Sequence, residues 1–106
     1  MNEGWRRSHK DEVVASLRNK QGVQQFLDAQ ALLKRHLVHT RQILNGKDFL
    51  FLGPRNELHD ALKLIVNVEH EYSRFIHIDY VQVDEFFLLR IVGSEADQQL
   101  VSGYFE

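Results

Sequence analysis

The chain has 106 residues, of which 43% are hydrophobic and 26% are charged, and these values are typical of one globular domain in solution. It contains no cysteine, which excludes a disulfide framework, a thiolate metal site and a cysteine nucleophile. Residues 1–7 lack the apolar core of a signal peptide, and no run of about 18 apolar residues predicts a membrane-spanning helix. We therefore expect a cytoplasmic protein without a membrane partner.

The charges are unevenly distributed along the chain. Residues 1–47 carry nine Lys or Arg and four Asp or Glu, whereas residues 48–106 carry four and eleven. The net charge of −2 therefore conceals a basic half and an acidic half. Such halves can pair within one molecule, with a second copy or with an anionic partner.

The first residues predict a basic arm followed by a helix. Residues 1–7 contain two arginines and a tryptophan in no regular pattern, and we interpret them as a flexible basic arm. Ser8 followed three residues later by Asp11 is typical of a helix N-terminus. The sequence therefore predicts a first helix over residues 9–20, at the start of a single α+β domain that spans residues 8–106.

A second, longer helix is predicted over residues 23–44. At about 100° per residue, one face of this helix is apolar and consists of Phe26, Leu33, Leu37 and Leu44. A weaker stripe lies beside it and contains Leu32, His36, His39 and Ile43. Asn45 and Gly46 fit either a hairpin turn or a helix C-cap, and the helical period before them favours the cap. Because a helix with two apolar stripes contacts two neighbours, the weaker stripe is a candidate association surface.

The middle of the chain predicts a buried strand and an amphipathic helix. Residues 48–52 form a short apolar run, which is typical of a strand buried on both faces. Gly53 and Pro54 end this strand, and because proline is favoured in the first helical turn, we expect a helix from there to Ser73. The apolar stripe of that helix consists of Leu58, Ala61, Leu62, Ile65, Val68 and Tyr72.

Residues 75–93 predict a β-hairpin with its turn at residues 84–85. Residues 86–92 are nearly all apolar, which favours a central position in the sheet. The first strand of the hairpin alternates, with its apolar side chains at Ile76, Ile78 and Tyr80. The two valines that follow, Val81 and Val83, are out of phase with this alternation. They indicate either a bulge near the last of those residues or a strand buried on both faces.

Together these elements predict an α+β fold. Two N-terminal helices precede a β-α-β-β unit that forms a small three-stranded sheet, and a short C-terminal helix follows, for which Ser94 and Asp97 provide a capping box. A sheet of three strands has long edges, and the apolar edge formed by residues 76–83 favours pairing with another chain. Two-fold dimers are the commonest oligomers, so we expect a homodimer.

The sequence contains no recognisable catalytic motif. His36 and His39 are three residues apart, but two histidines hold a metal only with further ligands, and the residues around this pair are basic. Glu69 and Glu71 are two apart on a predicted helix and do not converge, so we interpret them as solvated. We therefore expect no catalytic residue, no metal site and no cofactor.

The main hypothesis is a small non-enzymatic regulatory or accessory protein that forms a homodimer and binds a protein partner. The residues expected to form its association surface are Leu32, His36, His39, Ile43, Ile76, Ile78 and Tyr80. The alternative is a nucleic-acid-binding regulator, because a basic surface with an aromatic side chain can follow a phosphate backbone and stack a base. The residues expected to serve that role are Trp5, Arg6, Arg7, Lys10, Lys34, Arg35 and Arg41. A pI near 6.3 weighs against it.

Overall fold

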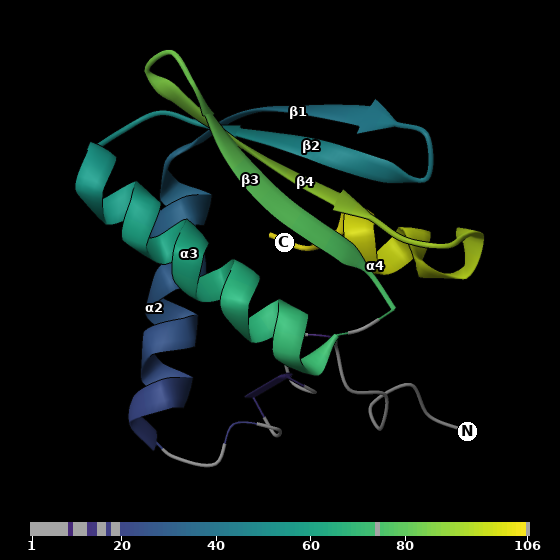
Figure 1. The fold of residues 1–106 in the computed structure, drawn as a ribbon, viewed down its shortest axis with the longest axis horizontal. Coiled ribbons are helices and arrows are strands. Elements are labelled where there is room, and N and C mark those ends of the chain that lie inside the picture. Colours follow the sequence, from purple (N-terminus) through teal and green to yellow (C-terminus); the bar gives the residue numbers. More distant parts are fainter. Residues whose placement is uncertain (1–8, 10–12, 15–16, 18–19, 74, 106) are drawn as a thin grey trace.

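The structure, a computed structural model, describes residues 9, 13, 14, 17, 20–73 and 75–105 (Figure 1). Its elements follow the chain as α2 (Lys20–Arg35), β1 (Leu37–Ile43), β2 (Gly46–Phe51), α3 (Arg55–Tyr72), β3 (His77–Val83), β4 (Phe86–Val92), a 3-10 turn η2 (Glu95–Asp97) and α4 (Gln98–Ser102). The four strands form one antiparallel sheet in the order β1-β2-β4-β3, and Figure 1 shows α2, α3 and α4 on the same side of it. Within the described part of the chain, no helix is long and apolar enough to cross a bilayer.

The helices bury one side of this sheet. α3 lies against β3 and β4, α4 lies against β2, and α2 packs along α3. Sheet and helices meet in one core, whose fully buried side chains include Phe26, Leu33, Phe51, Leu58, Leu62, Ile65, Leu89 and Ile91. Tyr104 and Phe105 complete the core beyond α4, where the ring of Phe105 lies 5.0 Å from that of Phe49 and 5.5 Å from that of Phe51.

The predicted helix over residues 23–44 is wrong in its second half. α2 ends at Arg35, and residues 37–43 form β1, which pairs with β2. The segment contains β-branched side chains that favour extended backbone. Asn45 adopts φ 59°, a left-handed conformation that asparagine tolerates, so it turns the chain into a hairpin and does not cap a helix. The sheet therefore has four strands instead of the predicted three.

The predicted N-terminal arm and first helix fall largely outside the described residues. His9, Val13 and Val14 are helical, and Leu17 is not. Val13 belongs to the core, and Val14 and Leu17 pack against it. Residues 1–7, which were predicted to form the basic arm, lie outside the described residues.

Several elements with strong local signals are confirmed. α3 begins after Pro54, and its apolar stripe is buried except at Val68 and Tyr72, which are partly exposed. β4 lies between β2 and β3, as its apolar sequence predicted. The side chain of Ser94 donates to Asp97 Oδ2 at 2.7 Å, and the amide of Ser94 donates to the same oxygen at 2.9 Å. This pair is the predicted capping box at the start of the C-terminal helical segment.

The out-of-phase valines of β3 mark neither a bulge nor a strand buried on both faces. β3 pairs with β4 in continuous register from His77 to Val83. Val81 and Val83 project from the side of the sheet away from the helices and are 53% and 47% exposed. The register shift in the described sheet lies instead in β1, between Leu37 and His39. The phase change therefore marks an apolar end of β3, formed by Val81 and Val83 on the side of the sheet that faces away from the helices.

The left-handed conformation of Asn45 leads to a test of the β1–β2 hairpin. We expect Asn45→Val to lower the free energy of unfolding by about 1–2 kcal/mol, because a β-branched residue is strained at positive φ. The matched control is Leu44→Val, its neighbour in the turn, which should stay within about 0.5 kcal/mol of the parent chain. Urea unfolding followed by circular dichroism measures both. Equal stability of the two variants would contradict this turn.

Candidate functional site

The side of the sheet that faces away from the helices, here called the outer face, presents side chains from all four strands. Its members are His39, Arg41 and Ile43 on β1, Asp48 and Leu50 on β2, Phe86, Leu88, Arg90 and Val92 on β4, and His77, Asp79, Val81 and Val83 on β3. The intervening residues of β2 and β4, such as Phe49 and Leu89, are buried beneath the helices. No element in the described ranges covers the outer face (Figure 1).

Cross-strand pairing arranges these side chains in rows. The charged row consists of Arg41, Asp48, Arg90 and Asp79, in the order β1, β2, β4, β3. The neighbouring row consists of His39, Leu50, Leu88 and Val81 in the same strand order, and we call it the apolar row because three of its four side chains are aliphatic. Phe86 and Val83 pair with each other and extend the apolar surface beyond that row. The outer face thus combines charged and apolar groups in a fixed geometry.

The centre of the charged row is a shared ion pair. Arg90 donates from Nε to Asp48 Oδ1 at 2.7 Å and from Nη2 to Oδ2 at 2.9 Å, and Arg41 Nη2 donates to Oδ2 at 2.8 Å. The hydrogen bonds from Arg90, together with the Arg41 contact and both charges, hold the pKa of Asp48 below its usual range although burial opposes them. The Asp48 side chain is 3% exposed, whereas those of Arg41 and Arg90 are 63% and 50% exposed. Both guanidinium groups keep N–H donors that this carboxylate does not use.

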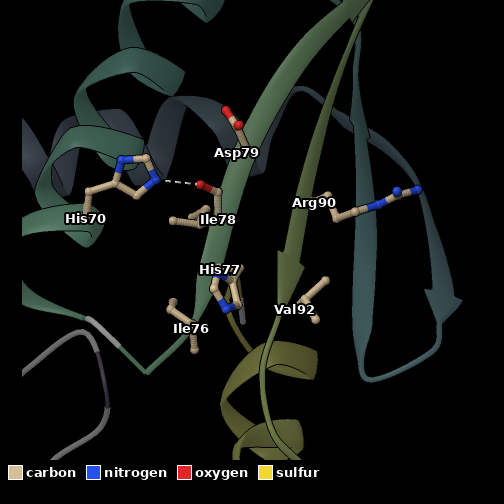
Figure 2. A pocket seen from close by; sticks show the side chains of 7 residues that line it. All are labelled: His70, Ile76, His77, Ile78, Asp79, Arg90 and Val92. Carbon is tan, nitrogen blue, oxygen red and sulfur yellow. Dashed lines mark hydrogen bonds between the residues drawn. The ribbon is translucent and has the colours of Figure 1, made fainter.

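At the β3 end of the charged row, Asp79 has no cationic partner in the part of the chain that the structure describes. It pairs in register with Arg90, but the Arg90 side chain extends away from it, toward β2 (Figure 2). One Asp79 oxygen, Oδ1, accepts the backbone amide of Tyr80 at 2.9 Å. Among the residues that the structure describes, Asp79 takes part in no salt bridge. The exposed carboxylate of Asp79 therefore lies at one end of the row. At the other end lies the guanidinium group of Arg41, which donates to Asp48 from Nη2 alone.

Two hollows border the charged row on its β3 side. One has a volume of about 410 Å³ and is lined by Asp79, Tyr80, Val81, Leu88 and Arg90. The other has a volume of about 290 Å³ and is lined by His70, Ile76, His77, Ile78, Asp79, Arg90 and Val92 (Figure 2). Both mix apolar side chains with Asp79 and Arg90, so a partner that fills them would meet apolar surface and charge together.

The free edge of β3 is partly closed by the protein's own side chains. His70 donates from Nε2 to the carbonyl oxygen of Ile78 at 2.7 Å (Figure 2), and the Tyr80 amide is bound to the Asp79 carboxylate. A partner strand needs such backbone groups to be free. The edge pairing predicted for residues 76–83 is therefore disfavoured, and the outer face is the better candidate surface.

The structure does not gather the predicted association residues on one surface. Leu32 packs against the core, Ile76 and Ile78 are buried in it, and Tyr80 lies on the helix side of β3 with its ring 5.8 Å from that of His59. His36 follows α2 and lies so close to Gly53 that a Cβ there would meet its Nδ1 at 2.5 Å. The two residues on the outer face are His39 and Ile43.

His36 and His39 do not form the helical pair that their spacing suggested, because α2 ends at Arg35, before His36. Within the described ranges, no three His, Asp or Glu side chains gather as metal ligands.

The residues of the nucleic-acid hypothesis are also dispersed or undescribed. Trp5, Arg6, Arg7 and Lys10 lie outside the described residues. Lys34 and Arg35 are exposed in the last turn of α2, and Arg41 binds Asp48 on the outer face. Nucleic-acid binding by this set stays a prediction that none of these contacts tests.

A second polar cluster lies inside the molecule, around Glu69. The sequence interpretation of Glu69 as solvated is wrong, because its side chain is fully buried. Its Oε1 and Oε2 lie 2.9 and 3.0 Å from His9 Nε2, and Tyr104 donates its hydroxyl to Oε2. Burial alone would raise the pKa of Glu69, but hydrogen bonds from His9, Ser73 and Tyr104 lower it below the usual range. An ionised Glu69 accepts hydrogen bonds only, so His9 Nε2 is the donor.

The same environment affects Tyr104 in the opposite direction. Burial, and then the charge and hydrogen bond of Glu69, raise the pKa of Tyr104 well above its ordinary value. Tyr104 therefore remains a neutral hydrogen-bond donor. The cluster joins His9 and Tyr104, which are 60 and 35 residues away from Glu69, to α3.

The cluster does not have the geometry of a catalytic triad. Ser73 Oγ and the Glu69 carboxylate both approach the same nitrogen of His9, Nε2, at 3.4 Å and 2.9 Å. In a triad the nucleophile and the carboxylate bind opposite ring nitrogens. His9 Nδ1 is buried and has no hydrogen-bond partner among the described residues, and Ser73 is 2% exposed. The arrangement is a buried hydrogen-bond cluster that holds α3 to His9 and Tyr104, and we call it the tie at Glu69.

Comparisons with protein-family models, with curated proteins and with solved structures give no match to this chain. A functional assignment therefore depends on the geometry of its own residues.

The lowered pKa of Glu69 predicts how stability depends on pH. A carboxyl group whose pKa is lower in the folded chain stabilises the fold above its unfolded pKa of about 4.3, and this contribution is lost as pH falls through the folded value. We expect Glu69→Gln to lower the free energy of unfolding at pH 7 by about 1–3 kcal/mol, because the buried donors lose their charged acceptor. The deficit should shrink toward pH 3.

The control for this experiment is Glu71→Gln, which changes an exposed carboxylate two residues further along α3. It should follow the parent chain at each pH. Urea unfolding between pH 3 and pH 7 measures all three proteins. If the free energy of unfolding of Glu69→Gln varied with pH in parallel with that of the parent chain, the tie at Glu69 would be contradicted.

Proposed function

We propose that this chain is a small non-enzymatic protein of the cytoplasm that acts by association, forming a homodimer and presenting itself to a protein partner. The observation that carries the proposal is the outer face, where a helix-free sheet surface joins exposed apolar side chains to a row of charges. The lack of cysteine is consistent with a reducing compartment.

The apolar character of the outer face supports an association role. In an antiparallel sheet with one solvated face, outward positions are normally polar. Here three of the four outward positions of β4 are apolar, namely Phe86, Leu88 and Val92. Beside them Val81 and Val83 are about half exposed. Contiguous apolar surface of this kind on a small protein is typical of an interaction site.

The charged row supports specificity. Interfaces gain orientation and selectivity from charges placed within an apolar surround. Asp48 orders Arg41 and Arg90 in advance, so that their side chains lose less conformational freedom when a partner binds. A partner with carboxylates beside apolar side chains matches this pattern.

The polar cluster around Glu69 supports a role without catalysis. Its carboxylate has no exposed surface, and His9 offers both Glu69 and Ser73 the same nitrogen. General acid–base work needs a carboxylate that a substrate can reach, and that of Glu69 is buried.

The proposal predicts self-association that depends on the outer face. Sedimentation across micromolar concentrations should give a mass that rises from 12.5 kDa toward twice that value. Leu88→Lys should keep the chain monomeric, because it places a charge in the centre of the apolar row. Leu44→Lys makes the same change at a turn residue that is 88% exposed, and it should associate like the parent chain.

Circular dichroism verifies that both variants fold. A parent chain that stays monomeric throughout, or a Leu88→Lys variant that dimerises normally, would refute the proposal.

A further inference from the structure

We infer that the outer face binds a second copy of this chain, related by a two-fold axis that runs parallel to the strands and passes between β2 and β4. This inference rests on the proposed function and adds the orientation of the two copies and the contacts between them. It follows from the order of the charges across the sheet.

The charged row alternates in sign from one edge of the sheet to the other. Arg41 on β1 is positive, Asp48 on β2 negative, Arg90 on β4 positive and Asp79 on β3 negative. Reversing the strand order therefore reverses every sign. A surface with this property is complementary to its own reversed copy.

A two-fold axis parallel to the strands produces that reversal. When two outer faces meet across such an axis, β1 of one copy lies over β3 of the other, and β2 lies over β4. Arg41 then faces Asp79 of the second copy, and Asp48 faces Arg90 of the second copy. Because a two-fold contact is isologous, each pairing occurs twice.

The alternative axis, perpendicular to the strands within the interface plane, gives the opposite result. It places each strand over the same strand of the second copy. Where this axis passes through the charged row, Arg41 faces Arg41 and Asp79 faces Asp79, and where it passes elsewhere, the charged row lies over a different row of the second copy. Like charges opposed in this way are repelled. The charge order therefore favours the axis parallel to the strands.

The groups at the two ends of the row have free bonding capacity for these contacts. Arg41 uses one guanidinium nitrogen for Asp48 and is 63% exposed. Asp79 Oδ2 has no hydrogen-bond partner among the described residues, since Tyr80 binds the other oxygen. An ion pair between Arg41 and Asp79 of the second copy would use these free donors and this free oxygen, and it would leave the hydrogen bonds to Asp48 intact.

The apolar row fits the same arrangement. Across the axis parallel to the strands, Leu50 lies over Leu88 of the second copy, next to the centre of the interface. Val81 lies over His39 of the second copy, at the edges. Sheets that pack face to face keep their strands within about 30° of each other, so the rows stay approximately aligned near the axis.

The size of the face predicts a weak dimer. Four strands about 4.8 Å apart and seven residues long span roughly 19 Å by 23 Å, or about 440 Å² of flat area on each copy. This is smaller than the area of about 800 Å² per partner that is typical of stable complexes. The association is thus expected in the micromolar range or above, and its charge pairs should weaken with salt.

A mixing experiment tests the orientation. Arg41→Glu gives one copy two negative row ends, and Asp79→Lys gives the other two positive ends. Each variant alone places like charges opposite each other, and its self-association should weaken by at least about tenfold in low salt. An equimolar mixture should recover to within about threefold of the parent chain, because both end pairs are then of opposite sign.

The controls carry the same charge changes away from the face. Arg35→Glu on α2 and Asp60→Lys on α3 alter exposed residues, and neither single variants nor their mixture should differ from the parent chain. The double variant Arg41→Glu/Asp79→Lys should also self-associate, which keeps the inference testable if one single variant folds poorly. Sedimentation gives the association constants, and thermal melts verify the folding of each protein.

The outcomes separate this inference from the function that it rests on. A parent chain that dimerises and depends on Leu88, but whose mixture of Arg41→Glu and Asp79→Lys shows no recovery, overturns the orientation and leaves the function in place. Single variants that self-associate like the parent chain, with a mixture that associates more tightly than the parent, would likewise overturn it, since that pattern requires Arg41 to face Arg41. A monomeric parent chain overturns both.

Discussion

The outer face depends on the carboxylate of Asp48. It lies on β2 in the middle of the sheet, and its hydrogen bonds reach Arg41 on β1 and Arg90 on β4. A carboxylate that is 3% exposed requires such partners, because an unpaired buried charge is costly. By drawing Arg90 toward β2, Asp48 leaves Asp79 at the far edge without a counter-ion among the described residues. One buried charge therefore joins three strands and also determines which charges remain for a partner.

Local signals in the sequence predicted an element correctly where the hydrophobic pattern and the residues at the element's ends indicated the same structure. Pro54 and an apolar stripe predicted α3, and Ser94 with Asp97 predicted the capped C-terminal helix. Residues 37–43 were not predictable in this way, because Leu37, together with Leu44 just beyond the segment, continues the helical period of α2 although the segment pairs as a strand. The pairing with β2 and the left-handed turn at Asn45 decide the outcome, and strand preference depends on such context more than helix preference does.

In the sequence, residues of the candidate site stood out only as separate departures from the expected strand patterns. Arg90 interrupts an apolar strand, and Val81 and Val83 break the alternation of β3. Each anomaly marked the outer face, but their meeting depends on the strand order β1-β2-β4-β3, which no single segment encodes. Glu69 is a similar case. It lies four residues after Ile65 on the buried stripe of α3, so its position indicated burial although its charge suggested solvent.

The tie at Glu69 has a consequence for the two ends of the chain. α3 completes its buried face only when His9 and Tyr104 both reach Glu69, and Phe105 fills the core beside them. The hairpins pair residues that are close in sequence, whereas these contacts join residues 60 and 35 positions apart, so they are expected to form later in folding. Proteolytic loss of Tyr104 and Phe105 would therefore leave a hydrated carboxylate beside an unfilled apolar surface, in a form that is open to further cleavage.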